Sequence, residues 1–142
     1  MADELTLLVQ KTIPTGMTVA DGTGIEQGTV GKATDPNTFS ATNALNDLVG
    51  GVAAREKVAS DGQTKLAVFR GPGDIFKATA SGSIAMGDPL GLVGADGRPN
   101  LLRSVANVTG LSGSRIIGTA METAADGDTF RFELNIQNGV GF

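Results

Sequence analysis

The sequence predicts an all-β fold, a small antiparallel β-barrel or sandwich-like single domain with one or two short helices. Short apolar runs recur along the 142-residue chain and are separated by turn residues, among them 21 glycines. Strands at roughly 8–12-residue spacing are typical of sandwiches and barrels. In the last run Phe130, Phe132 and Leu134 alternate with charged residues, as in a strand with one buried face.

The expected strands follow one another with turns between them, at residues 5–9, 17–20, 28–33, 64–70, 74–80, 89–93, 116–121 and 129–134. Several of the turns contain Asp-Gly pairs, which accept the positive φ angles that tight turns require. Alternation puts Leu66 and Val68 on one face of their strand. We expect the core to contain Phe130, Phe132, Leu134, Leu66 and Val68.

The better of two helix candidates is Ala41 to Val49, where Ser40 or Thr42 can cap the first turn and Gly50-Gly51 can end it. Its Asn and Asp residues limit it to one or two turns. A weaker helical turn is expected at Leu101 to Val105, after Pro99-Asn100.

The chain also repeats itself weakly. Residues 51–69 and 118–134 both contain a small-residue strand, an Ala-rich bend, an Asp-Gly turn and an alternating strand. The distance from the first glycine to the aspartate differs by two residues between them. The pattern indicates repeated supersecondary structure and not a solenoid.

The composition excludes many functions. The chain has no Cys, His, Trp or Tyr, so thiolate and imidazole chemistry, zinc ribbons, imidazole metal sites and iron–sulfur clusters are absent. We expect no enzymatic activity, no cofactor and no metal site. Gly71-Pro72-Gly73-Asp74 lacks the Gly-Lys-Ser/Thr ending of a phosphate-binding loop, and the acidic turns lack the spacing of a calcium loop, so both are interpreted as turns.

The charge pattern limits the partners. With a net charge of −4 and scattered Lys and Arg, we expect no binding to nucleic acid. No apolar run approaches the roughly 20 residues of a membrane span, and the acidic N-terminus is unlike a signal peptide. We therefore expect a soluble protein that is made inside the cell.

The N-terminal segment, residues 1–15, is interpreted separately from a β-domain over residues 16–142. It contains Leu5, Leu7, Val9 and Ile13 ahead of Pro14. One interpretation is an edge strand of the barrel. The other is an arm that pairs with another protein by strand addition, in which case deleting residues 2–13 should leave the β-domain folded.

The stretch from Val49 to Leu134 resembles the capsid decoration (cement) proteins of tailed bacteriophages. The resemblance is carried by Gly-Gly-Val-Ala at 50–53, Thr-Lys-Leu-Ala-Val-Phe-Arg-Gly at 64–71, Asp-Ile-Phe-Lys-Ala at 74–78, Ile-Ala-Met-Gly-Asp-Pro-Leu at 84–90 and the segment 116–134. These motifs are structural and not catalytic. They cover about two-thirds of the chain.

The resemblance implies a protein made in the host cytoplasm that binds the exterior of the assembled capsid, commonly as a homotrimer bridging subunits of the major capsid protein. Leu5, Leu7, Val9 and Ile13 are the candidate capsid-binding residues, and Leu101, Leu102 and Leu111 are candidates for the trimer contact. Two alternatives stay open: another phage structural part, such as a tail-tube or fibre-attachment domain, or a ligand-binding β-domain.

Overall fold

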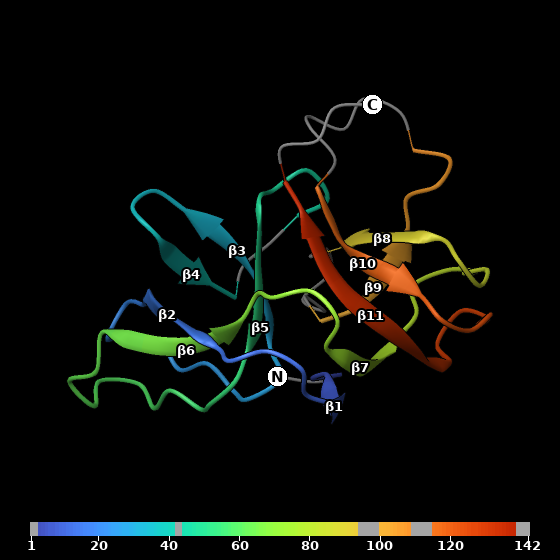
Figure 1. Ribbon diagram of the computed structural model, residues 1–142. Helices are drawn as coiled ribbons and strands as arrows, with labels where there is room; N and C mark the ends of the chain where they lie inside the picture. Colours follow the sequence, from blue (N-terminus) through green and yellow to red (C-terminus); the bar gives the residue numbers. More distant parts are fainter. Residues whose placement is uncertain (1–2, 42–43, 94–99, 109–114, 139–142) are drawn as a thin grey trace.

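The computed structural model describes residues 3–41, 44–93, 100–108 and 115–138, and these residues form strands and turns with no helix (Figure 1). The strands are β1 (Thr6–Val9), β2 (Thr15–Thr18), β3 (Val30–Thr34), β4 (Thr38–Ser40), β5 (Val49–Ala53), β6 (Lys65–Phe69), β7 (Ile75–Thr79), β8 (Pro89–Leu92), β9 (Leu102–Ser104), β10 (Ile116–Ala120) and β11 (Thr129–Gln137). The predicted all-β class is confirmed.

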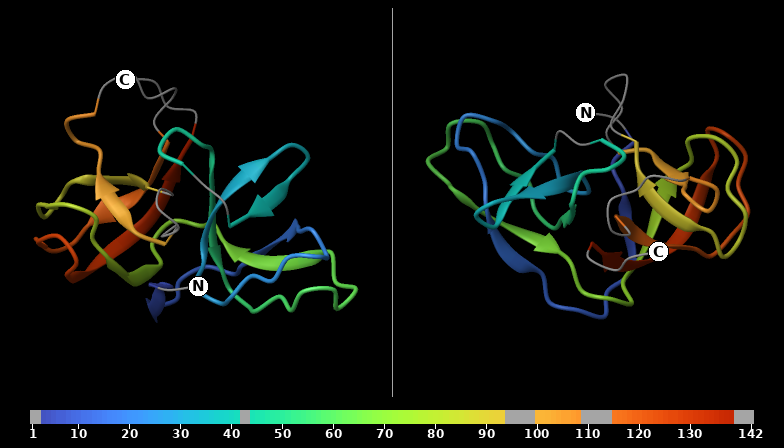
Figure 2. Two further views of the ribbon diagram at one scale, coloured as in Figure 1. Left: turned by 180° about the vertical axis from the view of Figure 1, so that it is seen from behind. Right: turned by 90° about the horizontal axis from the view of Figure 1, so that it is seen from above.

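The strands form two units that lie side by side (Figure 2). The first unit, residues 15–69, is a closed barrel in the order β2-β4-β3-β5-β6. The second unit, residues 75–137, forms a sheet with β1 added at one edge, in the order β1-β7-β11-β10-β8-β9. One buried apolar cluster contains Val30, Val52 and Phe69 of the first unit together with Phe76 and Phe132 of the second. Because this core is shared, the two units make one domain.

The second unit repeats the first. The strand order β2-β6-β5-β3-β4 corresponds to β7-β11-β10-β8-β9, and a parallel bridge between Ala80 and Leu102 stands where β2 meets β4. The loops repeat as well, since Ile25 pairs with Lys57 as Ile84 pairs with Ala124. The weak repetition seen in the sequence therefore belongs to a duplication of the whole five-stranded unit.

Hydrogen bonds of the loops match between the units. The Gly28 amide donates to the Ala53 carbonyl at 2.9 Å, and the Gly87 amide donates to the Ala120 carbonyl at 2.8 Å. Both glycines have a φ near +90° (88° and 89°), a conformation that glycine adopts at little cost.

The predicted core residues Phe130, Phe132, Leu134, Leu66 and Val68 are all buried. Phe132 stacks on Phe76 of the neighbouring strand, with ring centroids 5.9 Å apart. β10 lies between β11 and β8. It needs a glycine at position 118, because a Cβ there would lie 2.2 Å from the Glu133 carbonyl oxygen. The register inferred from alternation is confirmed.

Both helix predictions are wrong within the described residues. Residues 45–47 form a turn and a bend, in which the Asp47 carboxylate accepts the Ala44 amide at 2.9 Å and so competes with a helical bond. Val49 begins β5, a strand buried along its whole length. Residues 42–43 lie outside the described residues.

The second helix candidate is replaced by β9, which pairs with β8. Tertiary pairing overrides a weak local preference there. Leu101 and Leu102 are 7% and 0% exposed, so they form part of the core and offer no surface for a trimer contact. Leu111 lies outside the described residues.

The N-terminal segment is held at three places. The Leu5 amide donates to the Gly28 carbonyl at 2.8 Å, and β1 pairs antiparallel with β7. Farther along, the Lys11 and Thr12 amides donate to Oδ1 of Asp74 at 2.6 and 2.9 Å, while the Thr12 hydroxyl donates to Oδ2 at 2.5 Å. Asp74 is fully buried, so these donors satisfy a carboxylate that water does not reach.

Candidate functional site

The four candidate binding residues of the N-terminal segment divide into two pairs. Leu5 is 5% exposed and lies in the shared core, and Leu7 packs against that core. Val9 and Ile13 are 41% and 86% exposed. In this conformation only the second pair is available to a partner.

Leu8, 45% exposed, is a surface residue that was not among the candidates. The pairing of β1 with β7 shifts between Leu7 and Val9, and this irregularity places Leu8 and Val9 both toward solvent. Simple alternation predicts that one of them points inward, so the sequence alone did not indicate the exposed pair. Leu8 and Val9 of β1, and Ile13 four residues farther along the chain, are therefore exposed.

The β1 strand is the edge of the six-stranded sheet, with β7 as its neighbour. An edge strand presents backbone donors and acceptors on its outer side, and partner strands can add there. The irregularity in β1 shortens the regular part of this edge. Side chains on the adjoining face therefore matter as much as the backbone for any docking partner.

A shallow pocket of about 250 Å³ opens beside Leu8, and its lining residues are Leu8, Lys77, Glu122, Thr129, Phe130 and Arg131. Glu122 is bound twice by Arg131: its Oε2 accepts the Arg131 amide at 2.8 Å, and its Oε1 accepts the guanidinium at 3.0 Å. The Arg131 side chain and then its amide lower the pKa of Glu122, and the same carboxylate raises the pKa of Arg131. This pocket combines an apolar wall with charged groups.

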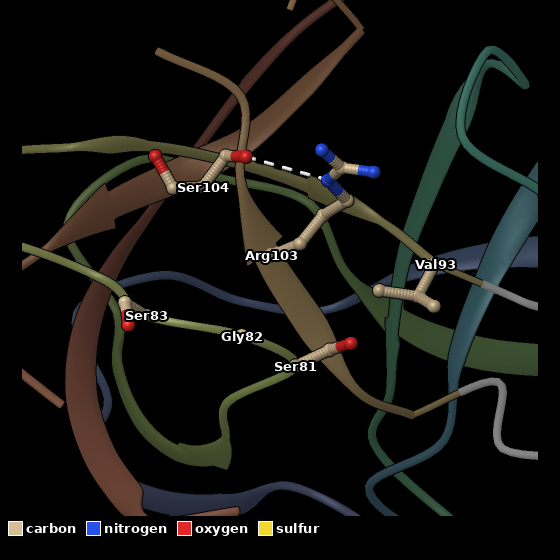
Figure 3. A pocket seen from close by; sticks show the side chains of 6 residues that line it. All are labelled: Ser81, Gly82, Ser83, Val93, Arg103 and Ser104. Carbon is tan, nitrogen blue, oxygen red and sulfur yellow. Dashed lines mark hydrogen bonds between the residues drawn. The ribbon is translucent and has the colours of Figure 1, made fainter. Parts of the chain in front are cut away.

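A second pocket, of about 360 Å³, lies in the second unit and is lined by Ser81, Gly82, Ser83, Val93, Arg103 and Ser104 (Figure 3). The Arg103 Nε donates to the Ser104 carbonyl at 3.4 Å. Figure 3 shows the Ser83 hydroxyl directed away from the Arg103 guanidinium, and its dashed line runs from Arg103 to the Ser104 backbone. The polar groups of this pocket do not converge on one point, as they would around a bound ion or a reacting atom.

Lys57 is a buried cation that the sequence analysis did not single out. Its ammonium donates to the Asp21 carbonyl and carboxylate, both at 3.0 Å, to the Val58 carbonyl at 2.8 Å and to the Asp61 carboxylate at 2.7 Å. Burial by itself lowers the pKa of Lys57, but the bonds and charges of Asp61 and Asp21 outweigh it, so the pKa is raised. The Lys57 bond, and then the Gln63 amide, lower the pKa of Asp61.

The Lys57 cluster is structural. Four acceptors occupy the ammonium, which leaves it no free position for a ligand. In the second unit Ala124 stands at the matching place, and the loops there are shorter: three residues separate Ala80 from Ile84, whereas five separate Val19 from Ile25. Lys57 holds the longer loops of the first unit in place, and a comparison of the two repeats could have identified it from the sequence.

The described part of the chain holds no group of three or more Asp or Glu residues suited to a metal ion. Among the same residues there is no helix of the length and apolar character that a membrane crossing needs.

No protein-family model matches the sequence, and no curated protein matches it. Among solved structures the chain is similar to the N base of the head fibre gp8.5 of bacteriophage phi29, with a TM-score of 0.52 and 14% identity. The match covers 92% of this chain and 94% of the phi29 chain. At this identity the similarity shows a shared fold that extends over both units.

Proposed function

We propose that this protein is a structural component of a phage virion that binds the outer surface of the capsid lattice and stabilises the head. On this proposal it acts as a homotrimer on the major capsid protein, catalyses no reaction and binds no nucleic acid. The observation that carries the proposal is the similarity to the phi29 head-fibre base, which spans nearly the whole length of both chains.

The candidate site supports a binding role. Leu8 and Val9 on the edge strand β1, and Ile13 after it, are exposed apolar side chains that a partner protein covers on binding. The polar groups of the pocket beside Arg103 do not converge on one point. The sequence resemblance to capsid decoration proteins points to the same kind of partner.

Repeated weak contacts suffice for stabilisation of a lattice. A protein that bridges several capsid subunits converts later contacts into intramolecular ones, so modest individual affinities add up to a firm attachment. A compact β-domain with a shared core suits this role, because little conformational entropy is lost on binding.

The test is co-sedimentation of the purified protein with expanded phage heads that lack it, followed by heating of the loaded and bare heads. The proposal expects saturable binding and retention of packaged DNA to a higher temperature in loaded heads. Absence of binding contradicts it. Binding without any change in head stability contradicts the stabilising role alone.

A second candidate is a base that attaches a fibre to the head, which the description of the phi29 chain as the N base of a head fibre favours. On this alternative the protein binds heads at few sites and leaves their stability unchanged. Counting the copies per head distinguishes the two, since a lattice-stabilising protein occupies the whole surface.

A further inference from the structure

The outer face of the second unit carries two cations directly opposite one another. Lys77 on β7 is in register with Arg131 on β11, and both side chains are exposed. Like charges at directly opposite positions destabilise a sheet. Arg131 is compensated by Glu122 at 3.0 Å, whereas Lys77 forms no ion pair or hydrogen bond with the described residues.

The first unit shows that the fold does not require these charges. In each unit one bond closes the sheet, from the Val19 amide to the Thr64 carbonyl at 3.0 Å and from the Ala80 amide to the Asp128 carbonyl at 2.9 Å. Lys77 and Arg131 each lie three residues from the bonded residue of their strand, Ala80 or Asp128. The residues at the same offset from Val19 and Thr64 in the first unit are Gly16 and Ala67, which also pair across the strands. Two small neutral residues therefore occupy the place that Lys77 and Arg131 occupy in the second unit.

The charges around this pair favour an anion. Lys77, Arg131 and Glu122 leave one net positive charge at the pocket, on a chain whose net charge is −4. Glu133 is exposed on the same face of β11, opposite Ile75 and diagonal to Lys77, but it forms no ion pair with Lys77. Leu8 forms an apolar wall, and the free edge of β1 continues from it.

We propose that the Lys77–Arg131 pair, with Leu8 beside it, is the docking point for an acidic side chain on a partner protein. The inference rests on the proposed function, and the partner segment is one that carries a Glu or Asp next to an apolar residue. The carboxylate lies between the two cations, and the apolar residue contacts Leu8. A protein segment fits better than nucleic acid, because two cations neutralise few phosphates and the rest of the chain is acidic.

The first experiment compares head binding by the wild type with that of Lys77→Glu, Lys77→Arg and Lys65→Glu. Lys77→Glu places an opposite charge across from Arg131, so the fold is retained. Lys65→Glu makes the same charge change on an exposed β6 residue of the first unit and is the matched control. We expect at least a tenfold loss of affinity for Lys77→Glu alone, with Lys77→Arg close to the wild type. Equal binding by both glutamate variants overturns the inference.

The second experiment does not depend on heads. The isotopically labelled protein is titrated with an extended peptide that carries Glu beside Val and with its Gln counterpart. We expect amide shifts at residues 8, 77, 130 and 131 with the Glu peptide, absent in Lys77→Glu. Equal shifts with both peptides, or none, overturn the docking point.

The outcomes of the two experiments separate the two proposals. If the wild type does not bind heads, the proposed function fails, and the peptide titration decides the docking point by itself. If the wild type binds heads and Lys77→Glu binds equally well, only the docking point fails. Two other results give the cations a different role and overturn the inference. One is DNA binding that is lost in Lys77→Glu, and the other is a change in the mass of the oligomer in that variant.

Discussion

Asp74 ties the end of the N-terminal segment, at Lys11 and Thr12, to the start of the second unit, and replacing it by Ala removes this tie while the pairing of β1 with β7 remains. The carboxylate accepts three hydrogen bonds from Lys11 and Thr12 at 2.5–2.9 Å and is fully buried. The donors, the two amides and the Thr12 hydroxyl, lie 62 or 63 residues before Asp74 in the chain. Asp74→Ala therefore removes a long-range tie and leaves the rest of the sheet unchanged.

The magnitude follows from these bonds. A hydrogen bond to a charged group contributes about 1.5–3 kcal/mol, and three such bonds set an upper limit. Lys11 is exposed and Thr12 half-buried, so the freed donors reach water and part of the loss is recovered. We expect a decrease in the free energy of unfolding of about 3–5 kcal/mol, or a decrease in Tm of about 8–15 °C.

Urea denaturation measures the change, and hydrogen exchange at the Lys11 and Thr12 amides shows whether the segment detaches. Asp88→Ala is the matched control, because Asp88 accepts one hydrogen bond, from the Ala85 amide at 3.0 Å; its expected cost is about 1 kcal/mol. A cost for Asp74→Ala no larger than that of Asp88→Ala refutes the reasoning.

Further predictions concern the core, the N-terminal segment and the buried lysine. Phe132→Ala removes a fully buried ring that stacks on Phe76 and should cost about 3–5 kcal/mol by urea denaturation, whereas Ile13→Ala, at an exposed position, should leave the midpoint unchanged. Deleting residues 2–13 removes Leu5 from the core and all three donors from Asp74, so we expect a lower Tm; an unchanged Tm supports the free-arm interpretation. Lys57→Met should lower the free energy of unfolding, because Asp21 and Asp61 lose their ammonium partner; equal stability of variant and wild type contradicts this.

The Lys57 cluster also predicts that stability depends on pH. The pKa of Lys57 is raised in the folded protein, so its stabilisation is present below about pH 10 and is lost as the pH rises through the raised value. The pKa of Asp61 is lowered, so its stabilisation is present above about pH 4 and is lost as the pH falls through the lowered value. Unfolding curves of Lys57→Met measured across pH should lack the alkaline effect and show a smaller acid effect, because the Gln63 amide still lowers the pKa of Asp61.

The strand with the clearest alternation, β11, was predictable from its apolar spacing, whereas the three-residue strand β4 was not predicted. Phe130, Phe132 and Leu134 are assigned to the buried face by their spacing alone, and the structure confirms it. The predicted helix at 41–49 failed for a local and a tertiary reason: the Asp47 carboxylate accepts the Ala44 amide, and Val49 packs into the core shared by both units.

The candidate site was predictable only in part. Ile13 and Val9 are exposed as a binding surface requires, but Leu5 is drawn into the core by a contact with Gly28 that lies far along the chain. The sequence did not indicate the pair of cations Lys77 and Arg131, because they are 54 residues apart. Their meeting depends on the pairing of β7 with β11, and only the duplicated unit shows that the position is neutral elsewhere.

Whether the protein covers the capsid is tested most directly by a cryo-electron microscopy map of expanded heads mixed with an excess of the purified protein. The account predicts density for this two-unit fold as trimers at the three-fold positions of the lattice, with β1 and Leu8 facing the capsid subunits. Heads without added density, or single copies away from the three-fold positions, contradict it.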